Sequence, residues 1–217
     1  MINDYSTYRY NMVQFIKTWD VNDNNILELM ENISREMFFP EETSKLSYVD
    51  AMVPIGFGQV SLEPKMIARI LQSLNLKKNH KVLEIGTGTG YTTTLLSHLV
   101  KEVYTIEIIP EISEKAKKLF KNLNLKNIDI KTGNGMFGWD DKMLFDKIIV
   151  TGSLFETPVQ LISKLKDNGQ LFATIGNAPV MRAVTFTKNK GNIDKSYLFD
   201  TNIPKMQEIS ESEKFDL

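Results

Sequence analysis

The sequence contains no cysteine and only two histidines, His80 and His98, in 217 residues. Without cysteine the chain has no disulfide scaffold, no thiolate zinc site and no cysteine nucleophile. Two histidines are also too few for a histidine-rich metal site. We therefore expect a protein that binds no metal ion.

A charge excess and long apolar runs are missing as well. The 26 basic residues nearly balance the 27 acidic ones, for a formal net charge of −1, so bulk electrostatics does not favour nucleic acid. No apolar run approaches the roughly 20 residues that a membrane-spanning helix needs. The first residues lack the basic and apolar stretches of a secretory signal. We expect a cytoplasmic monomer or weak homo-oligomer that has neither nucleic acid nor a membrane as a partner.

The residues that are present are sufficient for a folded core. Hydrophobic residues make up 42% of the chain and aromatic residues 10%, as is usual for globular proteins. A length of 217 residues corresponds to one domain, or to one domain with an extension.

Short apolar runs alternate with helical periodicity between residues 61 and 190. Strands separated by helices of this length imply βαβ units, whose right-handed crossovers build a doubly wound sheet. We predict an α/β fold with a mostly parallel, Rossmann-like sheet. The predicted strands cover residues 81–85, 102–107, 128–130, 145–150, 171–175 and 183–187, and the predicted helices cover residues 64–74, 91–99, 110–123 and 158–165.

The sequence divides into three parts around this core. Residues 1–60 are expected to form a helical extension that covers the active site, with a helix over residues 26–33 that Asp23 or Asn24 caps and a loop over residues 53–59. Residues 61–190 form the core, and residues 191–217 add a C-terminal strand and tail. The tail is expected to be partly mobile and acidic, with Glu208, Glu211, Glu213 and Asp216.

The most informative segment is a glycine-rich stretch after the first core strand. Glu84 is followed by three alternating glycines, and we call residues 86–90 the glycine loop. Glycines there allow a ligand to approach the backbone, and the following helix offers free N–H groups. The loop is not a dinucleotide fingerprint, because Tyr91 stands where the last glycine would be, and it lacks the Gly-Lys-Ser/Thr of a phosphate-binding loop.

This pattern resembles the first motif of class I S-adenosyl-L-methionine (SAM) methyltransferases. The resemblance implies SAM as cofactor and S-adenosyl-L-homocysteine as product. It also implies that Glu107, 21 residues after Gly86, accepts hydrogen bonds from the ribose hydroxyls. Asn134 stands where the family usually has aspartate, and its amide oxygen can accept from the adenine amino group. The implied cofactor-binding residues are Glu84, Gly86, Thr87, Gly88, Gly90, Glu107, Ile108, Gly133, Asn134 and Gly135.

A narrower resemblance runs from about residue 9 to about residue 188. Taken together, its segments look like protein-L-isoaspartate O-methyltransferases. The segments are residues 9–13, 33–40, 48–50, 54–59 and 63–69 before the glycine loop, and residues 133–139 and 145–151 after it.

The family resemblance implies methyl transfer from SAM to the α-carboxylate of L-isoaspartyl residues in damaged proteins or peptides, which is a repair reaction. The methyl ester then collapses to a succinimide, part of which reopens as normal aspartate. A carboxylate with a pKa near about 3.5 is already ionised at neutral pH. The nucleophile therefore needs no general base, and catalysis can come from alignment and desolvation.

The sequence departs from the family at Val60, Ser61 and Leu62, which we call the acceptor turn. The family usually has Thr-Ile-Ser there, so its two hydroxyls fall on Val60 and Leu62. Ser61 could compensate only by a shift of register. We take Ser61 and Asp50 as the candidate catalytic residues. Two alternatives stay open: a methyltransferase with a different acceptor, and a SAM-binding module without catalysis.

Overall fold

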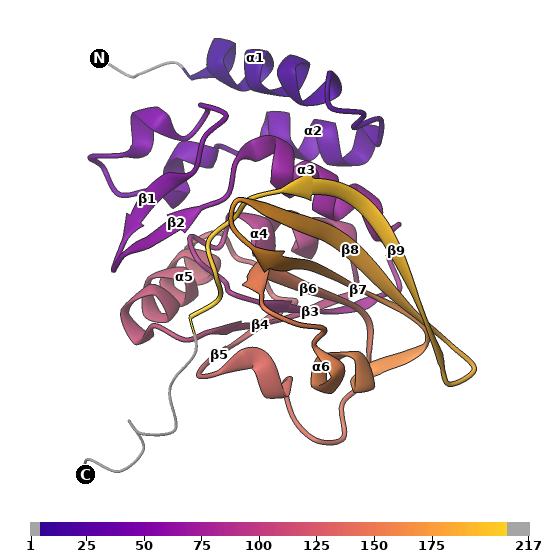
Figure 1. The fold of residues 1–217 in the computed structure, drawn as a ribbon. Helices are drawn as coiled ribbons and strands as arrows, with labels where there is room; N and C mark the ends of the chain where they lie inside the picture. Colours follow the sequence, from indigo (N-terminus) through magenta and orange to yellow (C-terminus); the bar gives the residue numbers. More distant parts are fainter. Residues whose placement is uncertain (1–4, 208–217) are drawn as a thin grey trace.

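A computed structural model of the protein describes residues 5–207 (Figure 1). Its centre is a seven-stranded sheet in the order β5-β4-β3-β6-β7-β8-β9. The first five of these strands run parallel, and β8 and β9 are antiparallel additions at one edge. This confirms the predicted mostly parallel sheet. The strands are β3 (Lys81–Ile85), β4 (Glu102–Glu107), β5 (Ile128–Thr132), β6 (Phe145–Leu154), β7 (Leu165–Asn177), β8 (Val180–Asn189) and β9 (Asn192–Thr201).

Helices cover both faces of the sheet. Leu171 and Phe172 are neighbours on β7 but belong to different apolar clusters, because successive strand side chains point to opposite faces. One cluster joins the sheet to the face that carries α3, α4 and α5, and the other joins it to α6. No helix between residues 5 and 207 is long and apolar enough to span a membrane. The core helices are α3 (Pro64–Ser73), α4 (Tyr91–Leu99), α5 (Pro110–Asn122) and α6 (Val159–Ser163), with a short 3-10 helix at Gly135–Phe137.

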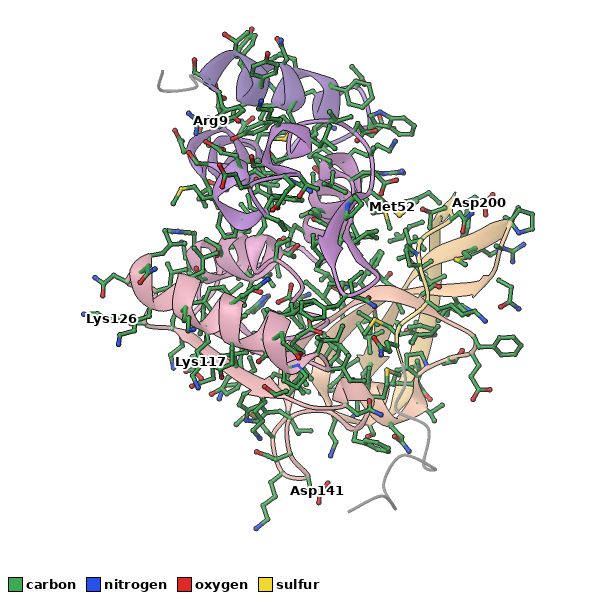
Figure 2. All side chains as sticks on the ribbon, turned by 90° about the vertical axis from the view of Figure 1, so that its left-hand side faces the viewer. Arg9, Met52, Lys117, Lys126, Asp141 and Asp200 are labelled. Atoms are coloured by element: carbon green, nitrogen blue, oxygen red, sulfur yellow. The ribbon has the colours of Figure 1, made fainter. Side chains whose placement is uncertain are left out.

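The N-terminal residues form a layer at one end of the molecule. Arg9 marks this layer in Figure 2, at the opposite end of the molecule from Asp141. Asp23 caps α2 as predicted, because its carboxylate accepts from the backbone N–H groups of Asn25 and Ile26. The elements of this layer are α1 (Ser6–Lys17), α2 (Asn24–Asn32), the 3-10 helices Arg35–Phe38 and Ser44–Leu46, and the strands β1 (Val53–Gly56) and β2 (Gln59–Ser61).

The predicted loop over residues 53–59 is wrong, because this segment belongs to the β1–β2 hairpin. Gly56 ends β1 and pairs with Gln59, and Phe57 and Gly58, both with positive φ angles, form the two-residue turn of the hairpin. Val53 and Ile55 alternate with exposed residues and are buried. The glycines therefore mark a reversal of the chain between two paired strands.

Further boundaries differ from the prediction. Strands β7 and β8 are both longer than the predicted strands over residues 171–175 and 183–187. The helix expected over residues 158–165 ends at Ser163, because Leu165 already pairs with Phe145 in the sheet. Strand β6 continues to Leu154, beyond its apolar run. The whole of residues 192–201 forms β9, which a tight turn joins to β8. The predicted acidic residues of the tail lie outside the described residues.

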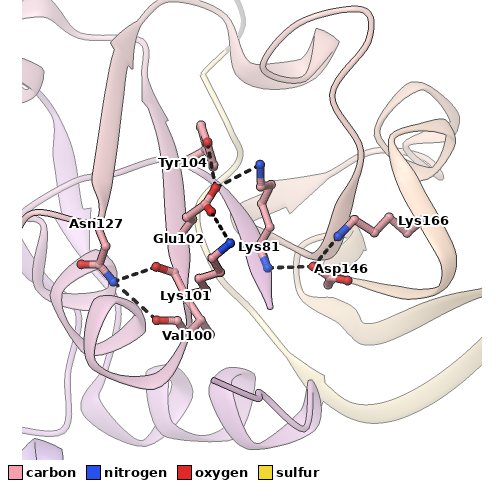
Figure 3. Close-up of polar contacts among 8 residues, drawn as sticks. All are labelled: Lys81, Val100, Lys101, Glu102, Tyr104, Asn127, Asp146 and Lys166. Atoms are coloured by element: carbon pink, nitrogen blue, oxygen red, sulfur yellow. Dashed lines mark hydrogen bonds and ion pairs between the residues drawn. The ribbon is translucent and has the colours of Figure 1, made fainter. Parts of the chain in front are cut away.

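Polar contacts tie together the amino ends of the parallel strands (Figure 3). Glu102 pairs with Lys81 at 3.0 Å and with Lys101 at 3.2 Å, which links β3 to β4. The backbone N–H of Lys81 donates to Asp146 at 2.7 Å, and Asp146 also pairs with Lys166 at 2.8 Å. These contacts link the amino ends of β3, β4, β6 and β7, and the carboxyl ends of these parallel strands meet at the opposite edge of the sheet.

Candidate functional site

A cavity lies at the carboxyl ends of the parallel strands, where open α/β sheets bind their ligands. We call it the strand-end cavity. Its empty space amounts to about 770 Å³, part of which is open to solvent. Most of the predicted cofactor residues line it, namely Gly86, Gly88, Glu107, Ile108, Gly133, Asn134 and Gly135.

Gly86 occupies a position that no larger residue can fill. Its φ angle is +93°, and an added Cβ atom would lie 2.3 Å from the Thr151 hydroxyl. That hydroxyl is within hydrogen-bonding distance of the carbonyl oxygens of Ile85, at 3.0 Å, and Gly86, at 2.9 Å. Thr151 on β6 thus fixes the start of the glycine loop.

Gly90 has a different reason to be glycine. An added Cβ atom would lie 2.8 Å from the ring of Phe120 on α5, and Gly90 does not line the strand-end cavity. Its place in the motif therefore reflects the close packing of the loop against α5. The glycine loop serves both the cavity and the packing of the helices.

Glu107 presents a buried carboxylate to the cavity. The residue is 5% exposed, and its two oxygens accept from the backbone N–H groups of Gly88, at 2.8 Å, and Ile109, at 3.1 Å. A carboxylate has about four acceptor positions. Glu107 therefore holds the glycine loop in place and keeps capacity to accept from two further hydroxyls.

Glu84 and Thr87 lie beneath the glycine loop and do not line the cavity. Thr93 and Thr105 donate their hydroxyls to one oxygen of Glu84, at 2.5 and 2.8 Å. Thr87 is linked to Thr105 at 2.7 Å. The other oxygen of Glu84 is buried without a partner in the described chain. Burial raises the pKa of Glu84 to about 7, against the lowering effect of the two threonines. The geometry gives Glu84 and Thr87 a supporting position behind the loop.

Asn134 lies between two glycines at the far side of the cavity. Its side-chain oxygen accepts from the backbone N–H of Met136 at 3.0 Å and so caps the short 3-10 helix. An amide oxygen has a second lone pair, and the amide nitrogen adds two donors. Gly135 packs closely beneath, where an added Cβ atom would lie 2.7 Å from Ile85.

The acceptor turn has its two apolar residues in the cavity and its hydroxyl outside it. Val60 and Leu62 line the strand-end cavity, whereas Ser61 does not. Ser61 is 9% exposed and accepts from a guanidinium nitrogen of Arg35 at 3.1 Å. Successive side chains in a strand point to opposite sides, so the register that brings Val60 inward turns Ser61 away. The structure does not contain the register shift that Ser61 would need.

Asp50 lies apart from the cavity as well. It forms an ion pair with Lys65 at 2.6 Å and lines a separate cleft beside Tyr48 and Pro64. The two candidate catalytic residues, Ser61 and Asp50, are therefore not brought together, and neither reaches the strand-end cavity.

One lining segment, near the C-terminus, carries no signal in the sequence. The chain after β9 returns past β2 towards the parallel strands (Figure 1). Its residues 204–207 line the cavity and pair with Ser153 through two backbone hydrogen bonds of 2.8 and 2.9 Å. Gln59 on β2 donates to Gln207 at 3.2 Å. Thr151, by contrast, could have been found, because it directly follows the apolar run of residues 148–150 in β6.

The donors and acceptors of the strand-end cavity fit a SAM-type molecule. Such a molecule needs acceptors for a ribose diol, polar backbone groups for its charged amino-acid end, and apolar walls for its ring. Glu107 can supply the acceptors, the backbone of Gly86 and Gly88 borders the cavity, and apolar side chains form the walls. The apolar lining includes Ile85, Ile106, Ile108, Ile112 and Met136.

Comparisons with known proteins identify the same family across most of the chain. The family model described as "Protein-L-isoaspartate(D-aspartate) O-methyltransferase" matches residues 9–203. A protein-L-isoaspartate O-methyltransferase from Dictyoglomus turgidum is 38% identical over 194 residues, which cover 89% of this chain and 88% of that protein. The enzyme of the same name from Aliivibrio fischeri is 40% identical over 163 residues, which cover 75% and 78%.

Solved structures show the same fold. One, described as a protein-L-isoaspartate O-methyltransferase, has a TM-score of 0.81 at 25% identity and covers 92% of this chain and 66% of that one. Another, from Plasmodium falciparum and described as a beta-aspartate methyltransferase in complex with S-adenosyl-L-homocysteine, has a TM-score of 0.79 at 23% identity and covers 92% and 98%.

Proposed function

The chain belongs to the protein-L-isoaspartate O-methyltransferase family, and we propose that it methylates the α-carboxylate of L-isoaspartyl residues in damaged proteins. It is a SAM-dependent O-methyltransferase that releases S-adenosyl-L-homocysteine. The observation that carries the proposal is the strand-end cavity, in which the glycine loop and Glu107 stand opposite the acceptor turn. Membership of the family over residues 9–203 identifies the reaction that this arrangement performs.

The residues around the cavity hold the methyl donor and leave the acceptor free to react. Bound SAM supplies a methyl group activated by a positively charged sulfur. Glu107 would accept from the ribose hydroxyls, and the backbone of Gly86 and Gly88 would lie against the amino-acid end. Asn134 would approach the adenine edge. Glu84, Thr87 and Gly90 would act from behind, since they support the loop without lining the cavity.

The acceptor needs no base from the protein. An α-carboxylate is ionised at neutral pH, and among the described residues that line the cavity Glu107 is the only carboxylate and Lys205 the only cation. A cation at the cavity suits an anionic nucleophile. Val60 and Leu62 offer apolar surface, which excludes water from the acceptor carboxylate and favours its reaction.

We propose that the three parts of the chain have different roles in this reaction. We assign residues 61–190 to the SAM-binding core, residues 1–60 to a cover over the active site, and residues 191–217 to an appended strand and tail. The contact between Gln59 and Gln207 supports a cover built from both ends of the chain. We further propose that the protein acts as a monomer or weak homo-oligomer.

A pair of matched peptides tests the proposed function. One peptide carries a single isoaspartyl residue and the other carries normal aspartate at the same position. Both are incubated with the enzyme and SAM labelled in its methyl group, and SAM binding is measured in parallel by calorimetry. Label is expected in the isoaspartyl peptide alone.

The other outcomes are equally informative. Label in both peptides would show a carboxyl methyltransferase without isoaspartyl specificity. Label in neither peptide, with SAM bound, would overturn the proposal in favour of another acceptor.

A further inference from the structure

Arg35 is the most unusual buried side chain of the N-terminal layer. It is 0% exposed, and no carboxylate pairs with it within the described part of the chain. Two of its guanidinium nitrogens, Nε and Nη1, are buried without a hydrogen-bond partner there. Burial lowers the pKa of Arg35 to about 10, so the side chain still carries its charge at neutral pH.

Burying a cation of this kind lowers the stability of the folded state. The loss of hydration amounts to several kcal/mol for an ion without a partner. Rings compensate only in part: the guanidinium lies 5.3 Å from the centre of the Phe39 ring and 5.0 Å from that of Tyr91. An apolar residue of similar size would avoid the cost, so stability alone does not explain Arg35.

The contacts of Arg35 join the two halves of the active site. One nitrogen, Nη2, donates to the carbonyl oxygen of Leu62 at 2.8 Å and to the hydroxyl of Ser61 at 3.1 Å. These atoms belong to the acceptor turn. The guanidinium also lies over Tyr91, the residue that follows the glycine loop and begins α4. Arg35 thus stands between the segment that faces the acceptor and the segment that holds the cofactor.

The neighbours of Arg35 fix its own position. Its backbone N–H donates to the hydroxyl of Tyr48 at 3.1 Å, and that hydroxyl donates in turn to Glu36. Phe38, one turn later, packs edge-on against Tyr91 with ring centres 5.2 Å apart. The guanidinium is therefore held by contacts before and after it in the chain.

We propose that Arg35 is a positioning residue that fixes the acceptor turn relative to the glycine loop. By holding Ser61 and the Leu62 carbonyl, it turns Val60 and Leu62 towards the strand-end cavity. Transfer requires the nucleophile, methyl group and leaving sulfur to be aligned, and a displacement of about 1 Å can reduce the rate about 100-fold. This inference rests on the proposed function, because it concerns the alignment of its acceptor.

The substitution Arg35→Met separates positioning from stability. Methionine fills similar space without the buried charge, so we expect a thermal unfolding midpoint at or above that of the parent. We expect kcat with the isoaspartyl peptide to fall about 10- to 100-fold, while S-adenosyl-L-homocysteine binds with unchanged affinity. Hydrogen exchange gives a readout independent of activity: backbone amides of residues 59–62 should exchange faster, and those of β3 should not.

Arg69→Met is the matched control. Arg69 on α3 also stacks on aromatic rings, those of Trp19 and Phe199, but it makes no contact with the acceptor turn in the described structure. We expect this variant to keep the exchange rates of residues 59–62 and the parent kcat. Arg35→Lys and Ser61→Ala should give intermediate losses, because each retains one link between residue 35 and the turn.

The following outcomes would contradict the positioning role of Arg35 or the proposed function. If Arg35→Met keeps the parent kcat and the parent exchange at residues 59–62, Arg35 is not a positioning residue. If that variant does not fold, Ser61→Ala takes its place, and parent-like values for it would contradict the inference. If the parent itself methylates neither peptide, the proposed function fails, and the exchange at residues 59–62 alone decides the role of Arg35.

Discussion

The two sides of the strand-end cavity are built in different ways. On the proposed cofactor side, the backbone of the glycine loop and the carboxylate of Glu107 border the cavity, and most of the residues that the motif predicts line it. On the acceptor side, the position of the turn depends on Arg35, which lies 26 residues earlier in the chain than Ser61. The proposed cofactor side therefore depends mainly on a local motif, whereas the acceptor side depends on side chains that are distant in the sequence.

The two sides also differ in how they bury charge. Glu84 beneath the glycine loop is 0% exposed, and so is Arg35 behind the acceptor turn. Burial raises the pKa of Glu84 to about 7, so this group can become neutral by binding a proton. Burial lowers the pKa of Arg35 only to about 10, so this group stays charged. Glu84 is therefore expected to titrate near neutral pH, and Arg35 is not.

The largest effect is expected at the start of the glycine loop. Gly86→Val adds a branched side chain at a φ angle of +93°, where its Cβ atom would lie 2.3 Å from the Thr151 hydroxyl. The loop must shift, and the backbone surface that receives the cofactor is lost. We expect SAM binding to be abolished in calorimetry while the sheet still folds. An affinity equal to that of the parent would refute the assignment of this loop to the cofactor.

The next effect concerns Glu84 and the pH dependence of stability. Since the pKa of Glu84 is about 7 in the folded state against 4.5 as its ordinary value, the native state binds more protons than the unfolded state between these limits. Its contribution to stability therefore falls as pH rises from about 4.5 to about 7, by roughly 3 kcal/mol in total, and is constant above.

Urea unfolding of the parent and of Glu84→Gln between pH 4.5 and 8 measures this contribution. The free energy of unfolding of the parent should decline relative to the variant up to about pH 7. If the free energies of unfolding of the two proteins depend on pH in the same way, Glu84 stays ionised. Glu84 and Arg35 would then not differ in their response to pH.

A smaller effect is expected at the cofactor carboxylate. Glu107→Ala removes the acceptors for the ribose hydroxyls and for the backbone N–H groups of Gly88 and Ile109. We expect SAM binding to weaken by about 1–3 kcal/mol, the usual cost of losing hydrogen bonds to a charged group. Glu107→Gln, which keeps one oxygen, should lose less. If Glu107→Ala binds SAM as the parent does, the ribose lies elsewhere.

The smallest effect is expected at Asp50. Its ion pair with Lys65 is partly exposed, with side-chain exposures of 20% and 25%, and such pairs contribute about 0–1 kcal/mol. Asp50→Asn should lower the free energy of unfolding by no more than this and leave methyl transfer unchanged. A large fall in kcat without loss of stability would instead support the prediction from the sequence that Asp50 is a catalytic residue.

Most of the core followed from the sequence because its patterns are local. Three elements have the predicted bounds: the strands at residues 81–85 and 102–107 and the helix at residues 91–99. A short apolar run or a helical periodicity can be recognised from the residues of the segment alone. The hairpin at residues 53–61 and the length of β7 did not follow. Both depend on pairing with residues that the local pattern does not include.

The candidate site likewise has a part that local sequence patterns predict and a part that depends on contacts between distant residues. The sequence by itself determined the fold class and the family, because the glycine loop and the alternating strands and helices are local patterns. It also predicted seven residues that line the cavity, among them Gly86, Glu107 and Asn134, which we propose as cofactor-binding residues. Only the tertiary structure decided the acceptor side. The register of β2 turned Ser61 outward, and Gln59 meets Gln207 across 148 residues of sequence. Such contacts form only when strands pair and layers pack, so no local pattern specifies them.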